Sequence, residues 1–225
     1  MALIPREFFA RPSVQVAPEV LGCVLEHQTA DGLVAVELTE VEAYAGRADP
    51  ASHAYRGKTA RNAVMFGPPG HAYVYFTYGM HFCVNLVCLG DGSASAVLLR
   101  AGRVIAGEEL ARARRTGSRA AGDADGARLA ARDLARGPGR LCQALGIDRA
   151  LDGADVCAAT SPLRVRREQA GRGTTARSEQ RKISSGPRVG IAVAAEVPWR
   201  FWFEGDPTVS AYKPYVARRR KPVTR

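Results

Sequence analysis

One segment of the chain, Leu33–Tyr44, follows a strict two-residue period. Its even positions are Val34, Val36, Leu38, Glu40, Glu42 and Tyr44. A period of two is the side-chain period of a β-strand, so we predict a strand whose apolar face turns acidic near its end. A buried face that changes from valine to glutamate marks the place where a hydrophobic core becomes a cleft. Strict alternation puts Glu40 and Glu42 on that same face.

The remaining elements are predicted from turn signals and apolar patterns. We predict further strands at residues 72–77, 81–89, 95–100 and 198–203, the first two joined by a hairpin turn at Gly79. Helical composition predicts helices at residues 18–25, 103–116, 125–136 and 140–145. Residues 46–70 are predicted to be irregular, and residues 164–186 to form a flexible basic loop. Because strands and helices do not alternate in βαβ units, we predict one α+β domain over residues 1–225.

The chain is strongly basic, with a net charge of +10 and an isoelectric point near 9.8. Of its 32 basic residues, 4 are lysine and 28 are arginine, and a basic tail occupies residues 217–225. The planar fork of arginine suits bidentate contact with phosphate, so nucleic acid is the expected partner. A GC-rich genome would explain the ratio of arginine to lysine, but it would not explain the net charge.

Cysteine usage and hydropathy exclude several classes of protein. The five cysteines are odd in number, include no C-x-x-C pair and are predicted to be reduced. A zinc deaminase is disfavoured because no set of histidine and cysteine has the required ligand spacing. The first residues carry mixed charges, unlike a signal peptide, and no apolar run approaches transmembrane length. We expect a cytoplasmic protein without a membrane contact.

Acidic and aromatic residues occur close together in this basic chain. Glu40 and Glu42 are followed by Tyr44, His53 and the tyrosine-rich segment 73–78. Carboxylates among aromatic rings bind phosphate poorly, but they suit a pocket that receives a nucleobase. The residues alone do not choose between the two glutamates, and a solvated strand end is the structural alternative.

The other candidates also have structural interpretations. His53 fits a loop histidine, and at least one of Tyr73 and Tyr75 is expected to be structural. Tyr78 precedes the hairpin glycine, where a large ring has little protein to pack against, so an external partner is expected. Asn85 lies in an apolar strand, and a buried amide needs partners, either backbone groups or a substrate edge.

A series of motifs across nearly the whole chain resembles one enzyme family. The motifs are Glu40-Val-Glu-Ala-Tyr44, Ala51-Ser-His53, Arg61-Asn62, Met65-Phe66, Tyr73-Val-Tyr75, Tyr78 through Asn85, Ala96 through Arg100, Gly137 through Gly146, Arg188 through Ile191 and Pro198 through Phe201. Their order and spacing resemble those of the 3-methyladenine (alkyladenine) DNA glycosylases. The resemblance implies one compact α+β domain, a curved antiparallel sheet with a protruding hairpin, and flanking helices.

The resemblance also assigns the chemistry. The family hydrolyses the N-glycosidic bond of alkylated and some deaminated purines in duplex DNA, without a metal or redox cofactor. It implies that Glu42 is the general base, while Glu40 supports the site indirectly or lies at the surface. Tyr44, His53 and Tyr75 would wall the base pocket.

Further residues match the family pattern beyond the catalytic strand. The resemblance implies that Tyr78 enters the DNA in place of the flipped nucleotide. Asn85 would lie at the pocket floor with Arg100 nearby, although Arg100 also fits a side chain that extends to solvent. Val189 would lie close to the lesion.

The sequence therefore predicts a monofunctional glycosylase of base-excision repair, a bacterial-type monomer that acts on the nucleoid. A lyase activity is disfavoured because it requires an amine nucleophile, and the family gives Lys58 no such role. The alternative is a non-catalytic or RNA-directed nucleic-acid-binding α+β domain. The preferred lesion and the ordering of residues 164–186 on DNA stay open.

Overall fold

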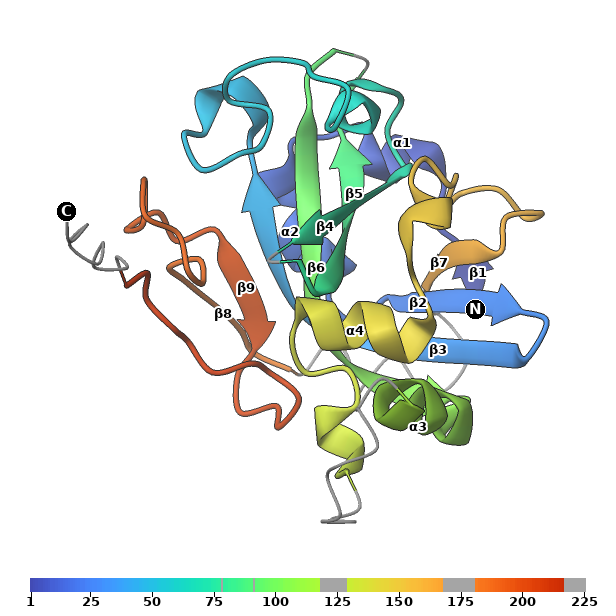
Figure 1. Cartoon of the computed structure of the whole chain (residues 1–225). Coiled ribbons are helices and arrows are strands. Elements are labelled where there is room, and N and C mark those ends of the chain that lie inside the picture. Colours follow the sequence, from blue (N-terminus) through green and yellow to red (C-terminus); the bar gives the residue numbers. More distant parts are fainter. Residues whose placement is uncertain (78, 91, 118–128, 168–180, 217–225) are drawn as a thin grey trace, which may run out of the picture.

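The structure is a computed structural model that describes residues 1–77, 79–90, 92–117, 129–167 and 181–216 (Figure 1). Over these residues, nine strands form one antiparallel sheet that does not close on itself. The strands are β1 (Ala2–Leu3), β2 (Val24–Thr29), β3 (Gly32–Tyr44), β4 (Ala72–Thr77), β5 (His81–Cys88), β6 (Ser95–Ala106), β7 (Leu163–Arg167), β8 (Ile183–Gly186) and β9 (Arg200–Phe203). The predicted α+β class is confirmed.

Helices and short 3₁₀ turns flank the sheet. The α-helices are α1 (Arg6–Phe9), α2 (Ser13–Val20), α3 (Glu108–Gly117) and α4 (Pro138–Leu145). The 3₁₀ helices are Gly46–Ala48, Ala63–Phe66, Ala131–Asp133 and Arg149–Leu151. Helix α4 begins with proline at its first position and ends at Gly146 in the left-handed conformation (φ 72°). Proline at the start and glycine after the end are typical helix boundaries.

Strand β3 is the central element of the sheet. Its first half pairs with β2, the end of its second half pairs with β9, and β6 pairs along its opposite edge. In Figure 1 the sheet curves, because the first half of β3 lies with β2 and the second half turns upward beside β6. The predicted strand Leu33–Tyr44 is confirmed.

Helices cover the second half of β3 and its neighbours from both sides. In Figure 1, α2 lies behind the sheet, and α4 crosses in front of the lower ends of β5 and β6. The cross-strand row Ala43, Val97 and Leu86 is fully buried. Burial of this apolar row on one face leaves the other face of the same strands free to form a polar site.

Some predicted elements are wrong. Residues 24–29, assigned in part to a helix at 18–25, form strand β2, because the helix ends at Val20 and Gly22 turns the chain with φ 78°. Residues 103–106 continue β6, and the described part of the predicted helix 125–136 holds only a 3₁₀ turn.

The predicted flexible loop 164–186 also differs at both ends. Strand β7 extends to Arg167, and Ile183–Gly186 is strand β8. Residues 168–180 and the basic tail 217–225 lie outside the described residues. The predicted hairpin of β4 and β5 is confirmed, with Gly79 at φ 68°. In the described parts of the chain, no helix has both the length and the apolar character to cross a membrane.

Candidate active site

The floor of the site is a row of side chains across four adjacent strands. Glu42 on β3 is the Cα partner of Leu98 on β6, which pairs with Asn85 on β5, which pairs with Tyr73 on β4. Directly paired residues in an antiparallel sheet project from the same face. The three inner strands therefore bring a carboxylate and an amide that are distant in sequence onto one surface.

A cavity of about 590 Å³ lies over this row. Its size falls within the usual range of ligand pockets, about 300–1,000 Å³. The N-terminal end of α4 and the segment 189–191 form two of its walls. Its lining includes, in addition to the floor, Tyr44, His53, Tyr75, Arg100, Gly139 and Val189. Every residue of the predicted base pocket therefore lies at this one cavity.

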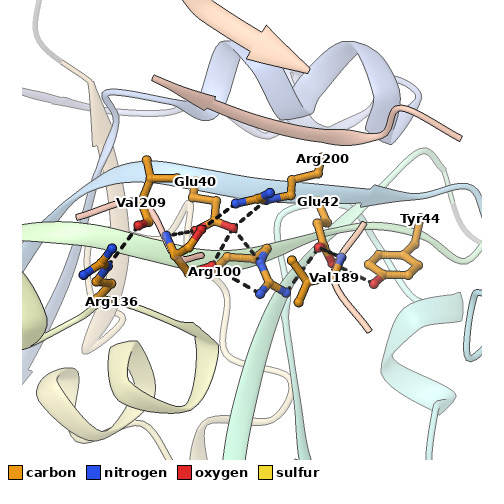
Figure 2. Close-up of polar contacts among 9 residues, drawn as sticks. Glu40, Glu42, Tyr44, Arg100, Arg136, Val189, Arg200 and Val209 are labelled. Carbon is orange, nitrogen blue, oxygen red and sulfur yellow. Dashed lines mark hydrogen bonds and ion pairs between the residues drawn. The ribbon is translucent and has the colours of Figure 1, made fainter. Parts of the chain in front are cut away.

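Glu42 is fully buried and held by three donors. Its Oε2 accepts a hydrogen bond of 2.8 Å from the Tyr44 hydroxyl, and its Oε1 accepts one of 2.7 Å from the Val189 backbone N–H. The guanidinium of Arg100 lies 3.2 Å from Oε1. Figure 2 shows these groups gathered around Glu42. The three contacts fix the direction of a carboxylate that opens onto the cavity.

Burial and the neighbouring anions change the acidity of these donors. Burial raises the pKa of Tyr44 well above its usual value, and the charge of Glu42 adds to that rise. Burial alone would lower the pKa of Arg100, but the charges of Glu42 and Glu40 outweigh it and raise that pKa. Tyr44 therefore stays a neutral donor, and Arg100 stays a fixed cation at the floor.

Glu40 is also fully buried but does not line the cavity. It accepts a hydrogen bond of 2.9 Å from Arg100 Nε and one of 2.8 Å from Arg200 Nε. The alternative that Glu40 is a surface group is wrong. Burial would raise its pKa, but Arg100 and Arg200 together with Ser210 lower it below the usual value.

The position of Arg100 follows from an irregular stretch of the β3–β6 ladder. The register shifts between Leu38 and Glu40 and again between Glu40 and Val41. Val41 pairs with Leu99 and Glu40 pairs with Ala101, so Arg100 has no Cα partner on β3 and lies opposite the step from Glu40 to Val41. Irregularities of this kind re-aim side chains next to active sites. Arg100 is 6% exposed, so the alternative that it extends to solvent is wrong.

Aromatic rings form the opposite wall. The rings of Tyr73 and Tyr75 stack with centroids 5.5 Å apart, and His53 meets Tyr75 edge-on at 4.6 Å. The Tyr73 hydroxyl lies 3.2 Å from His53 Nδ1. At least one of Tyr73 and Tyr75 was expected to be structural, but both line the cavity. Burial of the imidazole and the charge of Arg61 lower the pKa of His53, which favours the neutral ring.

Asn85 fits both of its predicted interpretations. Its side chain is 5% exposed and lines the cavity, and its Nδ2 donates a hydrogen bond of 3.2 Å to the carbonyl of Tyr73. The backbone bond fixes the amide while part of the group faces the cavity. A fixed amide at the floor can test the edge of a bound base.

An ion pair that was not predicted from sequence supports the Val189 segment. Arg188 and Asp49, each 1% exposed, form two contacts of 2.5 and 2.9 Å. Arg188 also donates to the carbonyl of Ala43 and lies over the Tyr44 ring at 4.7 Å. This pair ties the segment that provides the Val189 N–H to the end of β3. Arg188 belongs to one of the motifs of the family resemblance, but no local pattern in the sequence marks Asp49 as its partner.

The hairpin tip lies outside the protein core. Tyr78, the predicted wedge, is outside the described residues, but its neighbours are described. Phe76 is 45% exposed and Met80 is 67% exposed. Large apolar side chains in this position have no protein to cover them. Among the described residues, no group of three or more His, Cys, Asp and Glu could hold a metal ion.

A buried carboxylate at the floor of an aromatic-walled cavity, in a chain of net charge +10, defines a class of enzyme that acts on a base of nucleic acid. The sequence matches the methylpurine-DNA glycosylase (MPG) family over residues 7–207. The chain belongs to the methylpurine-DNA glycosylase family.

Curated relatives agree over nearly the full length. A protein of Streptomyces avermitilis is 54% identical over 97% of this chain and 95% of its own. One of Leifsonia xyli is 49% identical over 94% of this chain and 93% of its own. One of Methanocella arvoryzae is 44% identical over 95% of this chain and 98% of its own. Each is provisionally named a 3-methyladenine DNA glycosylase. The protein is thus a DNA glycosylase, and the predicted alternative of a non-catalytic or RNA-directed domain is not favoured.

Proposed function

We propose that the protein excises alkylated or deaminated purines from duplex DNA, with Glu42 as the general base. The observation that supports this most directly is the position of Glu42. Its carboxylate opens onto the cavity, and donors from three different segments hold it there. A general base must be fixed within reach of the water that it activates.

The cavity suits a purine that has left the helix. Tyr44 and Tyr75 provide aromatic faces on which a base stacks, and His53 borders the same space as a neutral ring. Glu42 then activates water for attack at C1′ and stabilises the positive charge that develops on the sugar. A cationic alkylated purine is already a good leaving group, so one carboxylate is sufficient.

The remaining predicted residues receive roles in DNA binding and selection. Asn85 rejects guanine at its exocyclic amino group, and Tyr78 fills the space left by the flipped nucleotide. The net charge of +10 attracts the DNA backbone and makes binding decrease with salt. The reaction needs no cofactor, and the enzyme acts as a monomer on the nucleoid in the cytoplasm.

An excision panel tests this proposal. Duplexes with 3-methyladenine, 7-methylguanine, hypoxanthine or ethenoadenine are incubated with the wild type and with Glu42→Gln, with and without EDTA. We expect the variant to lose at least about a hundredfold in rate, as loss of a general base does. Lesion binding should persist or tighten, because one negative charge leaves a site that faces DNA.

Glu37→Gln is the matched control, because Glu37 lies on the same strand, contacts two arginines and does not line the cavity. Near-wild-type turnover by Glu42→Gln would move the general base to another residue. Loss of activity in EDTA would contradict the metal-free mechanism.

A further inference from the structure

Glu40 is enclosed entirely by protein donors. Its Oε1 accepts hydrogen bonds from Arg100 Nε (2.9 Å), Arg200 Nε (2.8 Å) and the Ser210 hydroxyl (2.8 Å). Its Oε2 accepts a bond of 2.6 Å from the Ser210 backbone N–H. Figure 2 shows the side chains of Arg100 and Arg200 both reaching Glu40. Glu40 is not among the residues that line the cavity. A buried carboxylate with this number of donors is fixed in both position and charge.

One guanidinium connects this enclosed carboxylate to the catalytic one. Arg100 binds Glu40 through Nε at 2.9 Å and Glu42 through Nη1 at 3.2 Å. The two glutamates therefore share a single cation. Arg200 is the Cα partner of Glu42 on β9, but among the ion pairs of the described residues its guanidinium binds Glu40 and not Glu42. Glu40 therefore binds two cations, Arg100 and Arg200, while Glu42 binds Arg100.

We propose that Glu40 is a positioning residue that holds Arg100 against Glu42 and sets how much of the cation's charge reaches Glu42. The proposal rests on the role of Glu42 as general base. The segment 206–210 belongs to the same hydrogen-bond network. Arg200 Nη2 donates a hydrogen bond to the Ser210 carbonyl, and Arg136 donates one to the Val209 carbonyl. Arg136 also lines the cavity. The network thus links the catalytic floor to the wall beside α4.

Charge balance gives the proposal a distinctive signature. Glu40, Glu42, Arg100 and Arg200 carry two negative and two positive charges. Without the charge of Glu40, the charge of Arg100 acts on Glu42 alone, so the acid side of the activity profile should move to lower pH. Without the charge of Arg200, two carboxylates compete for Arg100, so the acid side of the activity profile should move to higher pH. The two changes must move the acid side of the activity profile in opposite directions.

Other titratable or charged groups act on Glu42 or line the cavity with it. The groups that act on it electrostatically are Tyr44 on β3, Tyr75 on β4, Cys83 on β5 and Arg188 on the segment before β9, and the cavity lining also includes His53, His81, Arg115, Arg136 and Arg140. None of them is altered in either variant. Because these groups are the same in both variants, they cannot move the midpoints of the two activity profiles in opposite directions.

The test measures single-turnover excision of one accepted lesion against pH. For Glu40→Gln we expect the acid-side midpoint to fall by about one pH unit, and for Arg200→Gln to rise by about one unit. Excision at the plateau should fall about tenfold in Glu40→Gln, while the Kd for lesion DNA changes less than about threefold. Arg200→Lys keeps the charge and should restore the wild-type midpoint.

Glu37→Gln is again the matched control. Glu37 lies on β3, the strand of Glu40 and Glu42, and contacts Arg103 at 2.5 Å and also Arg181. The substitution therefore also removes a β3 carboxylate that two arginines share. We expect its midpoint to equal that of the wild type. Circular dichroism confirms that each variant is folded before its profile is recorded.

The outcomes separate this proposal from the proposed function. If the wild type excises no lesion, the function itself is contradicted. If the wild type is active and both glutamine variants keep its midpoint, or shift it in the same direction, the role of Glu40 is overturned and the function stands. If neither variant folds, the network is structural and the proposal is equally overturned.

Discussion

Glu40 and Glu42 lie on one strand face, two residues apart, and both are fully buried, but their surroundings differ. Glu40 is closed in by Arg100, Arg200 and Ser210. Glu42 shares Arg100 but has a cavity on its open side. Burial therefore does not distinguish the two carboxylates. The difference lies in whether protein donors occupy every direction around the group.

The largest effect that we expect is on stability, from Glu40→Ala. This change leaves Arg100 and Arg200 without their common partner, and breaking a buried ion pair costs about 3–5 kcal/mol in free energy of unfolding. Glu42→Ala should cost much less, because Glu42 competes with Glu40 for one cation and borders an open space. Urea denaturation of both variants measures the comparison. Equal losses of unfolding free energy in the two variants would show that the surroundings of Glu40 and Glu42 do not differ in the way described.

The next effect concerns discrimination at the cavity floor. Asn85→Ser shortens the amide that faces the base edge, so guanine should be admitted. We expect the preference for hypoxanthine over guanine to fall by about ten- to a hundredfold, equivalent to about 1–3 kcal/mol. Excision of both bases, with guanine placed in a mismatch to ease its flipping, measures the ratio. An unchanged ratio with normal hypoxanthine excision would make Asn85 purely structural.

A smaller effect on the excision rate is expected from removing a single hydroxyl group beside either glutamate. Tyr44→Phe keeps the ring and removes the 2.8 Å hydrogen bond to Glu42. A hydrogen bond to a charged group is worth about 1.5–3 kcal/mol, so excision should slow by roughly tenfold or more. Ser210→Ala removes a hydroxyl bond to Glu40 but keeps its backbone bond. Single-turnover rates should change only about two- to threefold in Ser210→Ala, and the reverse order would contradict the assignment of roles.

The smallest expected effect is the pH dependence of stability. Arg100, Arg200 and Ser210 outweigh burial and lower the pKa of Glu40 in the folded protein below its usual 4.5. Such a group stabilises the fold above its unfolded pKa, and this contribution is lost as pH falls from about 4.5 through the folded value. The wild type should therefore lose more Tm than Glu40→Gln between about pH 5 and pH 3. Parallel melting curves would show that Glu40 does not titrate as described.

Local patterns predicted the parts of the molecule that depend on neighbours in sequence. The alternation of Leu33–Tyr44 identified the central strand, and Gly79 identified the β4–β5 hairpin. The residues proposed for the pocket from motifs all meet at one cavity, apart from Tyr78, which is not described. The side-chain period of a strand and the residue preferences of a turn each involve only a few neighbouring residues, so they can be recognised in a single sequence.

Features that depend on distant contacts were not predictable in this way. The apolar run after Val20 fits a helix as well as a strand, and only Gly22 and pairing with β3 decide for β2. Leu163 and Val165 alternate with arginines that composition assigned to a loop. The pairing of Arg188 with Asp49 joins residues 139 positions apart, and no local pattern reveals such a pair.

The donors around Glu42 decide at which stage of synthesis the surroundings of this carboxylate are complete. A nascent chain that ends at β7 already contains Glu42, Tyr44 and most of the sheet. It lacks the backbone N–H of Val189 and the Arg188 side chain that ties this segment down. If Glu42 is the general base proposed above, we expect excision only after the last part of the chain has been released from the ribosome. We also expect two fragments divided between β7 and β8 to be inactive separately, so that excision reports their reassembly in a complementation assay.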